Sequence, residues 1–172
     1  TGDEGITIIS GASAGDYGAL YFGDANRGTN GRIMYEQNNE IMSFYTNNAE
    51  RMRIDLSGTI FQGTTSPTLY SSVRGIVFEN GALINDVTRG AGKSITLAQN
   101  VAIDSGNTWA YLATDEASYY QQFGGNHYFA TCASGSAGAD ATLTSKLTIA
   151  NDGTSTFAGN ITLSGSSTTR YL

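Results

Sequence analysis

The chain has 172 residues and a mass of 18.1 kDa, carries a formal net charge of -6 and contains only 14% charged residues. It holds 22 glycines and is also rich in threonine, serine and asparagine, while aromatic residues make up 10%. The abundant small and polar residues weaken helices, and aromatic and β-branched residues favour strands. The composition therefore excludes a helical bundle and predicts an all-β fold. A hydrophobic content of 40% excludes a disordered chain.

The charge and hydropathy patterns also exclude two classes of partner. Nine basic residues stand against fifteen acidic ones without any basic cluster, so we expect no nucleic-acid binding. Apolar runs such as 19–22 and 76–78 are far shorter than the roughly 20 residues that span a bilayer, so we expect no membrane insertion. The single cysteine, Cys132, forms no internal disulfide. Because the first residue is Thr1 rather than methionine, we expect a processed product or a fragment.

The first part of the chain predicts a small antiparallel sheet. A strand at 19–22 is followed by a hairpin of strands 32–37 and 40–45, which turns at Asn38 and Asn39. The closing strand alternates between an apolar and a polar face. Its apolar residues are Met52, Ile54 and Leu56, and its polar residues are Arg51, Arg53 and Asp55.

Similar strands follow later in the chain. The middle part has a strand at 75–78 and a looser connection at 88–93. The last part has a strand at 109–112 and a hairpin of 118–123 and 126–129 that turns at two glycines. A long loop at 133–140 then leads to another alternating strand, with Leu143, Leu147 and Ile149 on its apolar face.

Short apolar segments that end in glycine recur at a regular spacing. The marker glycines are Gly11, Gly58, Gly106 and Gly153, which lie 47, 48 and 47 residues apart. This period predicts three fibre repeats, at 1–67, 68–106 and 107–172, with the only proline, Pro67, at the first seam.

Each predicted repeat is a sheet of about four strands, and such a sheet cannot bury its apolar face alone. The period is too long for a rung of a β-helix, and three propeller blades cannot close a ring. We therefore expect three chains to pack their sheets about a threefold axis. The repeats would stack as layers of a homotrimeric β-prism fibre.

One stretch of the chain resembles a known family. Its segments are Gly31–Tyr35, Phe44–Asn47, Glu50–Gly58 and Gly63–Pro67, and a looser copy spans Lys146–Gly159. The stretch resembles repeats in tail-fibre proteins of tailed bacteriophages, especially marine and cyanophage-like ones, found upstream of endosialidase-type intramolecular chaperone domains. Phe61–Thr64 stands where the family has Gly-Ile-Gly-Thr, and no chaperone domain can be placed in this sequence. The resemblance implies an extracellular virion fibre, homotrimeric and attached to other virion proteins.

Catalytic and metal-binding patterns are weak. His127 is the only histidine, and one histidine with one cysteine completes neither a nucleophile–base set nor a zinc site. The segment 90–94 mimics the end of a phosphate-binding loop but lacks its first glycine, and we interpret it as a turn. We interpret carboxylate pairs such as Glu36 and Glu40 as solvated charges in turns rather than as the catalytic pair of a glycosidase. We therefore expect no enzyme activity, no metal and no cofactor.

Residues 109–129 combine aromatic rings with amides, a mixture that suits both core packing and contact with a glycan. Because successive strand residues alternate faces, Tyr119 and Tyr120 cannot both lie inside. The candidate ligand-binding residues are Trp109, Tyr111, Tyr119, Tyr120, Gln121, Gln122 and His127.

Three functions remain open from the sequence. The first is a structural and adhesive phage fibre segment that presents or forms a region binding a host receptor, such as a surface glycan. The second is a monomeric carbohydrate-binding β-sandwich module that uses the aromatics of 109–129. The third is a capsule-degrading tailspike.

Overall fold

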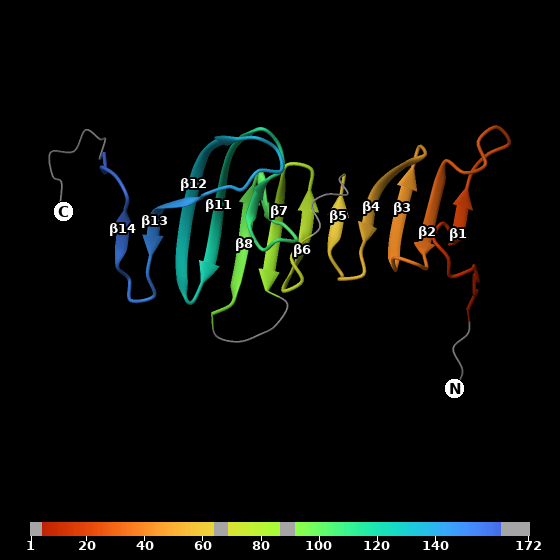
Figure 1. Ribbon diagram of the computed structural model, residues 1–172, viewed down its shortest axis with the longest axis horizontal. Helices are drawn as coiled ribbons and strands as arrows, with labels where there is room; N and C mark the ends of the chain where they lie inside the picture. The colour runs from red at the N-terminus through yellow and green to blue at the C-terminus, as the bar shows by residue number, and fades with distance from the viewer. Residues whose placement is uncertain (1–4, 64–68, 87–91, 163–172) are drawn as a thin grey trace.

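The computed structural model describes residues 5–63, 69–86 and 92–162, and in these ranges it contains strands and no helix. The predicted all-β class is confirmed. Twelve strands form one sheet in the order β1 (Tyr17–Phe22), β2 (Gly31–Glu36), β3 (Ile41–Thr46), β4 (Ala49–Ile54), β5 (Ile60–Gln62), β6 (Val73–Phe78), β7 (Gly81–Asp86), β8 (Ser94–Gln99), β11 (Asp115–Phe123), β12 (Asn126–Gly135), β13 (Thr144–Ile149) and β14 (Ser155–Phe157) (Figure 1). Two further strands, β9 (Val101–Ile103) and β10 (Trp109–Tyr111), form a separate two-stranded sheet, and Ala110 of β10 also bridges Asp140.

The large sheet runs without a break across the predicted seams. Neighbouring strands pair antiparallel except for β5 and β6, which pair in parallel with Ile60 beside Ile76. This pair places Phe61 beside Val77, and both side chains are almost fully buried. Within one chain the strands therefore form a single sheet rather than separate small ones. Pro67, at the first predicted seam, lies outside the described residues.

Both predicted hairpins are confirmed, but the two-residue turn expected at Asn38–Asn39 is wrong. The hairpin of β2 and β3 pairs Glu36 with Ile41, so its connection has four residues, and the positive φ, of 51°, falls on Glu40. The hairpin of β11 and β12 pairs Phe123 with Asn126, and Gly124 and Gly125 have φ of 59° and 82°. Two successive positive φ values are typical of the tight hairpin turn that twists with the strands. The connection of β7 and β8 lies largely outside the described residues.

Three other hairpins, β4–β5, β9–β10 and β13–β14, share one turn geometry, which we name the closing turn. The backbone N–H of the residue that opens each turn donates to the carbonyl of the fourth residue after it. The carbonyl of the opening residue accepts a hydrogen bond from the N–H of the third residue after it. The opening residues are Asp55, Asp104 and Ala150. The residue three positions on has a positive φ, which glycine and asparagine tolerate. These residues are Gly58 (81°), Asn107 (63°) and Gly153 (88°).

The carboxylate of Asp104 reinforces its closing turn. Its Oδ1 accepts hydrogen bonds from the backbone N–H groups of Thr108 and Gly106, at 3.1 and 2.9 Å, and from the Thr108 hydroxyl at 3.1 Å. These bonds, led by that from the Thr108 amide, lower the pKa of Asp104 below its ordinary value. The turn therefore gains stability above the carboxyl's unfolded pKa and loses it as the pH falls through the lowered one.

The buried core lies on one face of the sheet, which we call the covered face. The β9–β10 hairpin, which we call the covering hairpin, lies over the centre of the sheet on this side, where β9 contacts β7 and β11. One cluster joins Phe61, Val73, Val77, Ile84 and Ala102, and a second joins Ala98, Val101, Tyr111, Ala117 and Ala141. Residues 109–112, expected to open a third sheet repeat, thus belong to the covering hairpin instead. Asn100, which follows β8, has a φ of 57°, and its carbonyl accepts a hydrogen bond from the N–H of Leu112 at 3.0 Å.

The opposite face, which we call the open face, carries a continuous apolar row across the strands. Residues at the same register on neighbouring strands point to the same face. We call this row the central row. It consists of Tyr35, Met42, Ile54, Ile60, Ile76, Leu83, Leu97, Tyr120, Phe129, Leu147 and Phe157. Leu83, Leu97 and Phe129 remain 38%, 58% and 41% exposed. The central strands therefore bury one face within the chain and leave the other largely uncovered, and at the β1 end Ile8 lies against the open face beside Gly18.

Two leucines expected on the open face lie elsewhere. Leu56 sits in the closing turn after β4 and is 71% exposed, because the strand ends at Ile54. Leu143 precedes β13 and packs against the second core cluster. Met52, Leu147 and Ile149 do lie on the open face, at the register of Phe44, Phe129 and His127.

Candidate ligand groove on the open face

The seven candidate residues do not form one site. Trp109 and Tyr111 belong to the covering hairpin, and Tyr111 is buried, with its hydroxyl donating to the carbonyl of Ala133. Tyr119 and Gln121 lie on the covered face, at the register of Ala98 and Thr96. Tyr120, Gln122 and His127 lie on the open face.

The predicted separation of the two adjacent tyrosines is confirmed. Tyr119 faces the covering hairpin, where its ring lies 5.3 Å from that of Trp109. Burial raises the pKa of the Tyr119 hydroxyl above its ordinary value. Tyr120 points the other way, at the register of Leu97 and Phe129. Core packing thus accounts for Trp109, Tyr111 and Tyr119.

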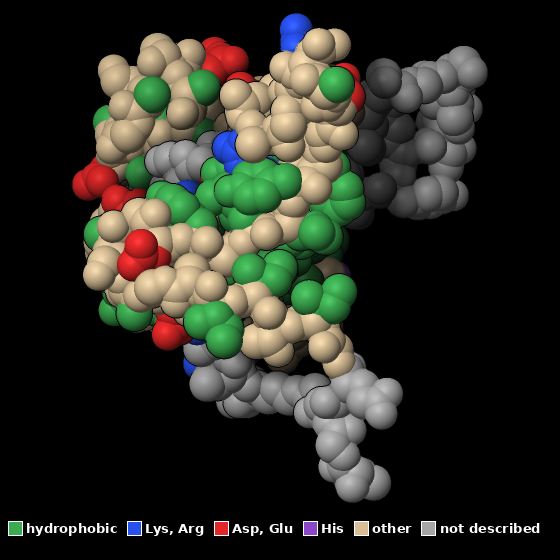
Figure 2. All heavy atoms as spheres, turned by 90° about the vertical axis from the view of Figure 1, so that its right-hand side faces the viewer, with side chains coloured by type: hydrophobic (Ala, Val, Ile, Leu, Met, Phe, Trp, Pro, Cys, Tyr) green, Lys and Arg blue, Asp and Glu red, His purple; other side chains and the backbone are tan. Residues whose placement is uncertain are grey.

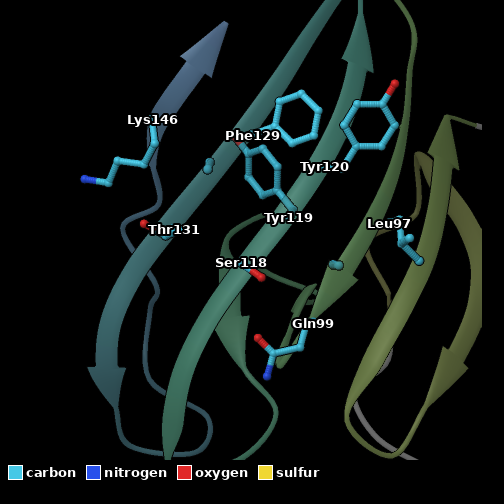
Figure 3. Close-up of a pocket in the computed structure, with 10 residues that line it drawn as sticks. Leu97, Gln99, Ser118, Tyr119, Tyr120, Phe129, Thr131 and Lys146 are labelled. Atoms are coloured by element: carbon cyan, nitrogen blue, oxygen red, sulfur yellow. The ribbon is translucent and has the colours of Figure 1, made fainter. Parts of the chain in front are cut away.

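A groove of about 520 Å³ lies over β8, β11, β12 and β13 (Figure 3). Its open-face side chains are of two kinds. The apolar ones belong to the central row, and the polar ones belong to the neighbouring register row or to the bulge in β13. The apolar side chains are Leu97, Tyr120 and Phe129, and the polar ones are Gln99, Ser118, Thr131 and Lys146.

The two rings in the groove are held in a fixed arrangement. Tyr120 and Phe129 are register partners, with ring centroids 4.9 Å apart and planes inclined by 33°. The Tyr120 hydroxyl is 2.6 Å from Nδ1 of His127, and these two rings stack with an interplanar angle of 16°. His127 therefore orients the Tyr120 ring from the adjoining register row.

Sequence reasoning missed Leu97, Gln99, Ser118, Thr131 and Lys146 as groove residues. Their places depend on how β8 pairs with β11, and β12 with β13, which no local pattern reveals. The expected loop at 133–140 is also largely ordered against the covering hairpin. Strand β12 continues to Gly135, and the N–H of Gly138 donates to the Tyr111 carbonyl at 2.8 Å.

The groove offers ring faces and uncharged hydrogen-bonding groups rather than an acid–base pair. None of its lining residues carries a carboxylate. Across the described ranges, no group of three or more His, Cys, Asp or Glu side chains could hold a metal ion. Such a surface suits binding by stacking and hydrogen bonds.

The comparisons with known proteins leave this site without a precedent. No family model, no curated protein and no solved structure matches the chain. Within the described residues, no helix is long and apolar enough to cross a membrane.

Proposed function

We propose that the chain is a non-enzymatic structural and adhesive segment of a virion fibre, similar to the tail fibres of tailed bacteriophages, and that it works as a homotrimer. The observation that carries this proposal is the uncovered apolar face of the large sheet. An apolar face of this length on a soluble monomer would be exposed to water, so another sheet is its natural partner.

The accessible surface of the chain supports the need for a partner. The chain exposes 11275 Å², whereas a compact monomer of its mass exposes about 8,100 Å². Assembly with sister chains would remove this surface from water.

The part of the open face formed by β1 to β7 is the better assembly surface. Beside the central row it carries a second apolar row, made of Leu20, Ile33, Phe44, Met52 and Phe78 with Gln62 among them. In β8, β11 and β12 the same register holds Gln99, Ser118 and Thr131. We therefore assign sister-chain packing to β1–β7, which we call the assembly half.

The β1 end of the sheet adds further apolar surface. Tyr17, Leu20, Tyr21 and Phe22 on this edge strand are 45% to 54% exposed. Figure 2 looks at this end and shows hydrophobic side chains gathered over its middle. Edge strands with such surface readily pair with another chain, which supports contacts along the fibre.

The alternative of a monomeric carbohydrate-binding module is favoured by one observation, the groove over β8, β11 and β12. The two candidates differ in how many chains assemble. They also differ in how slowly the protein dissociates in detergent.

We expect the assembled protein to resist detergent. Separation of three closely packed chains requires many non-local contacts to break together, so dissociation should be slow. Unheated protein kept in sodium dodecyl sulfate at room temperature should migrate as a trimer for hours, whereas a boiled sample should migrate as a monomer. Dissociation of the unheated sample within minutes would contradict an extensive interface.

A further inference from the structure

The groove on the open face has a platform of rings that nothing in the described structure covers. Leu97, Tyr120 and Phe129 follow one another on β8, β11 and β12, and Phe129 is 41% exposed. The bond between the Tyr120 hydroxyl and His127 fixes one ring before any ligand arrives. A preformed aromatic surface binds a flat apolar face at little cost in side-chain entropy.

The rim of the groove holds hydrogen-bonding groups that the protein itself does not use. Gln99, Ser118 and Thr131 are register partners on one side of the platform. Within the described ranges, none of these three side chains makes a hydrogen bond. By contrast, Gln121 on the covered face is bonded to Thr96 at 2.9 Å. The rim therefore offers unpaired amide and hydroxyl groups beside the rings.

The charge around the groove indicates what kind of ligand fits. No carboxylate lines it, and Lys146 is its only cationic group. Figure 3 shows the Lys146 side chain extending away from the two rings. A charged ligand would thus lose its hydration and find no opposite charge beside the rings, which costs free energy. The surface matches a ligand that is uncharged, apolar on one face and rich in hydroxyls at its edge.

We propose that this groove binds an uncharged saccharide. The C–H face of one sugar ring would lie on Tyr120 and Phe129, and its hydroxyls would bond to Gln99, Ser118 and Thr131. This inference deepens the proposed fibre function by naming the receptor class, and it rests on that function only for its biological purpose. The assembly half lies on other strands, so a trimer packed there leaves the groove free.

Saturation-transfer-difference NMR on the full chain tests the proposal. The probes are neutral trisaccharides of glucose, galactose, mannose and N-acetylglucosamine, together with trigalacturonic acid as the acidic probe. At least one neutral probe should receive saturation, and Tyr120→Ala should weaken its binding roughly tenfold or more. Gln99→Ala should weaken it less. Phe123→Ala removes an exposed aromatic ring on β11 outside the groove and serves as the matched control, with binding unchanged.

Three results of the binding measurements would overturn the saccharide site. They are silence from every neutral probe, stronger binding of trigalacturonic acid, and unchanged binding in Tyr120→Ala. Sedimentation of the same samples separates this test from that of the fibre. A Tyr120→Ala protein that loses its assembly would make the groove a chain interface and refute the site. A monomeric parent that binds sugar would refute the fibre and leave the site standing.

Discussion

Ile54→Asp is expected to abolish assembly while leaving the single chain folded. Ile54 lies on the central row of the assembly half, between Met42 and Ile60, and is only partly buried within its own chain. Packing of a sister chain would complete its burial. A carboxylate there would be buried without a partner, which costs about 3–5 kcal/mol in each chain. Sedimentation equilibrium should therefore give the mass of one chain for the variant.

Leu56→Asp is the matched control for this prediction. It introduces the same charge two residues further along, in a closing turn where the side chain is 71% exposed. Its mass should equal that of the parent, and both variants should keep the β-sheet circular dichroism of the parent. An Ile54→Asp protein that assembles like the parent would contradict packing on the assembly half.

Asn100→Ala should cause the largest loss of stability from a single polar residue. Asn100 is 2% exposed, and its side chain bonds three backbone groups, two in the segment before β11 and one at Glu116, near the start of that strand. Its Nδ2 donates to the carbonyls of Ala113 and Glu116 at 3.1 and 2.9 Å, and its Oδ1 accepts from the Ala113 N–H at 2.8 Å. Alanine would leave these partly buried backbone groups without their partners, at a cost of about 3–5 kcal/mol in the free energy of unfolding.

Urea unfolding followed by the fluorescence of Trp109, the only tryptophan, measures this loss where the covering hairpin lies. Asn107→Ala is the matched control, because Asn107 also has a positive φ, of 63°, but is exposed in a closing turn. Its cost should be only about 1 kcal/mol, from backbone strain. Equal losses in the two variants would show that the side-chain bonds of Asn100 contribute nothing.

The sequence predicted those parts of the fold that depend on near neighbours. The tight turn at Gly124–Gly125 follows from residues that tolerate positive φ, whereas in the hairpin at Asn38–Asn39 the positive φ falls on Glu40. Two of the marker glycines, Gly58 and Gly153, take the left-handed position of a closing turn. In the third closing turn this position belongs to Asn107, one residue after the marker Gly106, because asparagine also adopts that conformation.

The parts that were missed depend on distant partners. Residues 109–112 have the apolar pattern of a sheet strand, but 109–111 pair with β9, and Asn100 bonds the chain that follows them at Ala113 and Glu116. The parallel pairing of β5 with β6 has no sequence signal of its own. On the open face, Tyr120, Gln122 and His127 could be assigned to one side by alternation. Gln99 and Thr131 could not, because their proximity to Ser118 comes from the register of three strands.

The mass of the unmodified chain in solution is the most direct test of the proposed sister-chain assembly. Sedimentation equilibrium over a range of concentrations measures this mass without any assumption about shape. The uncovered open face predicts a single species of three times the 18.1 kDa chain mass, stable on dilution. A monodisperse species of 18.1 kDa would contradict the account.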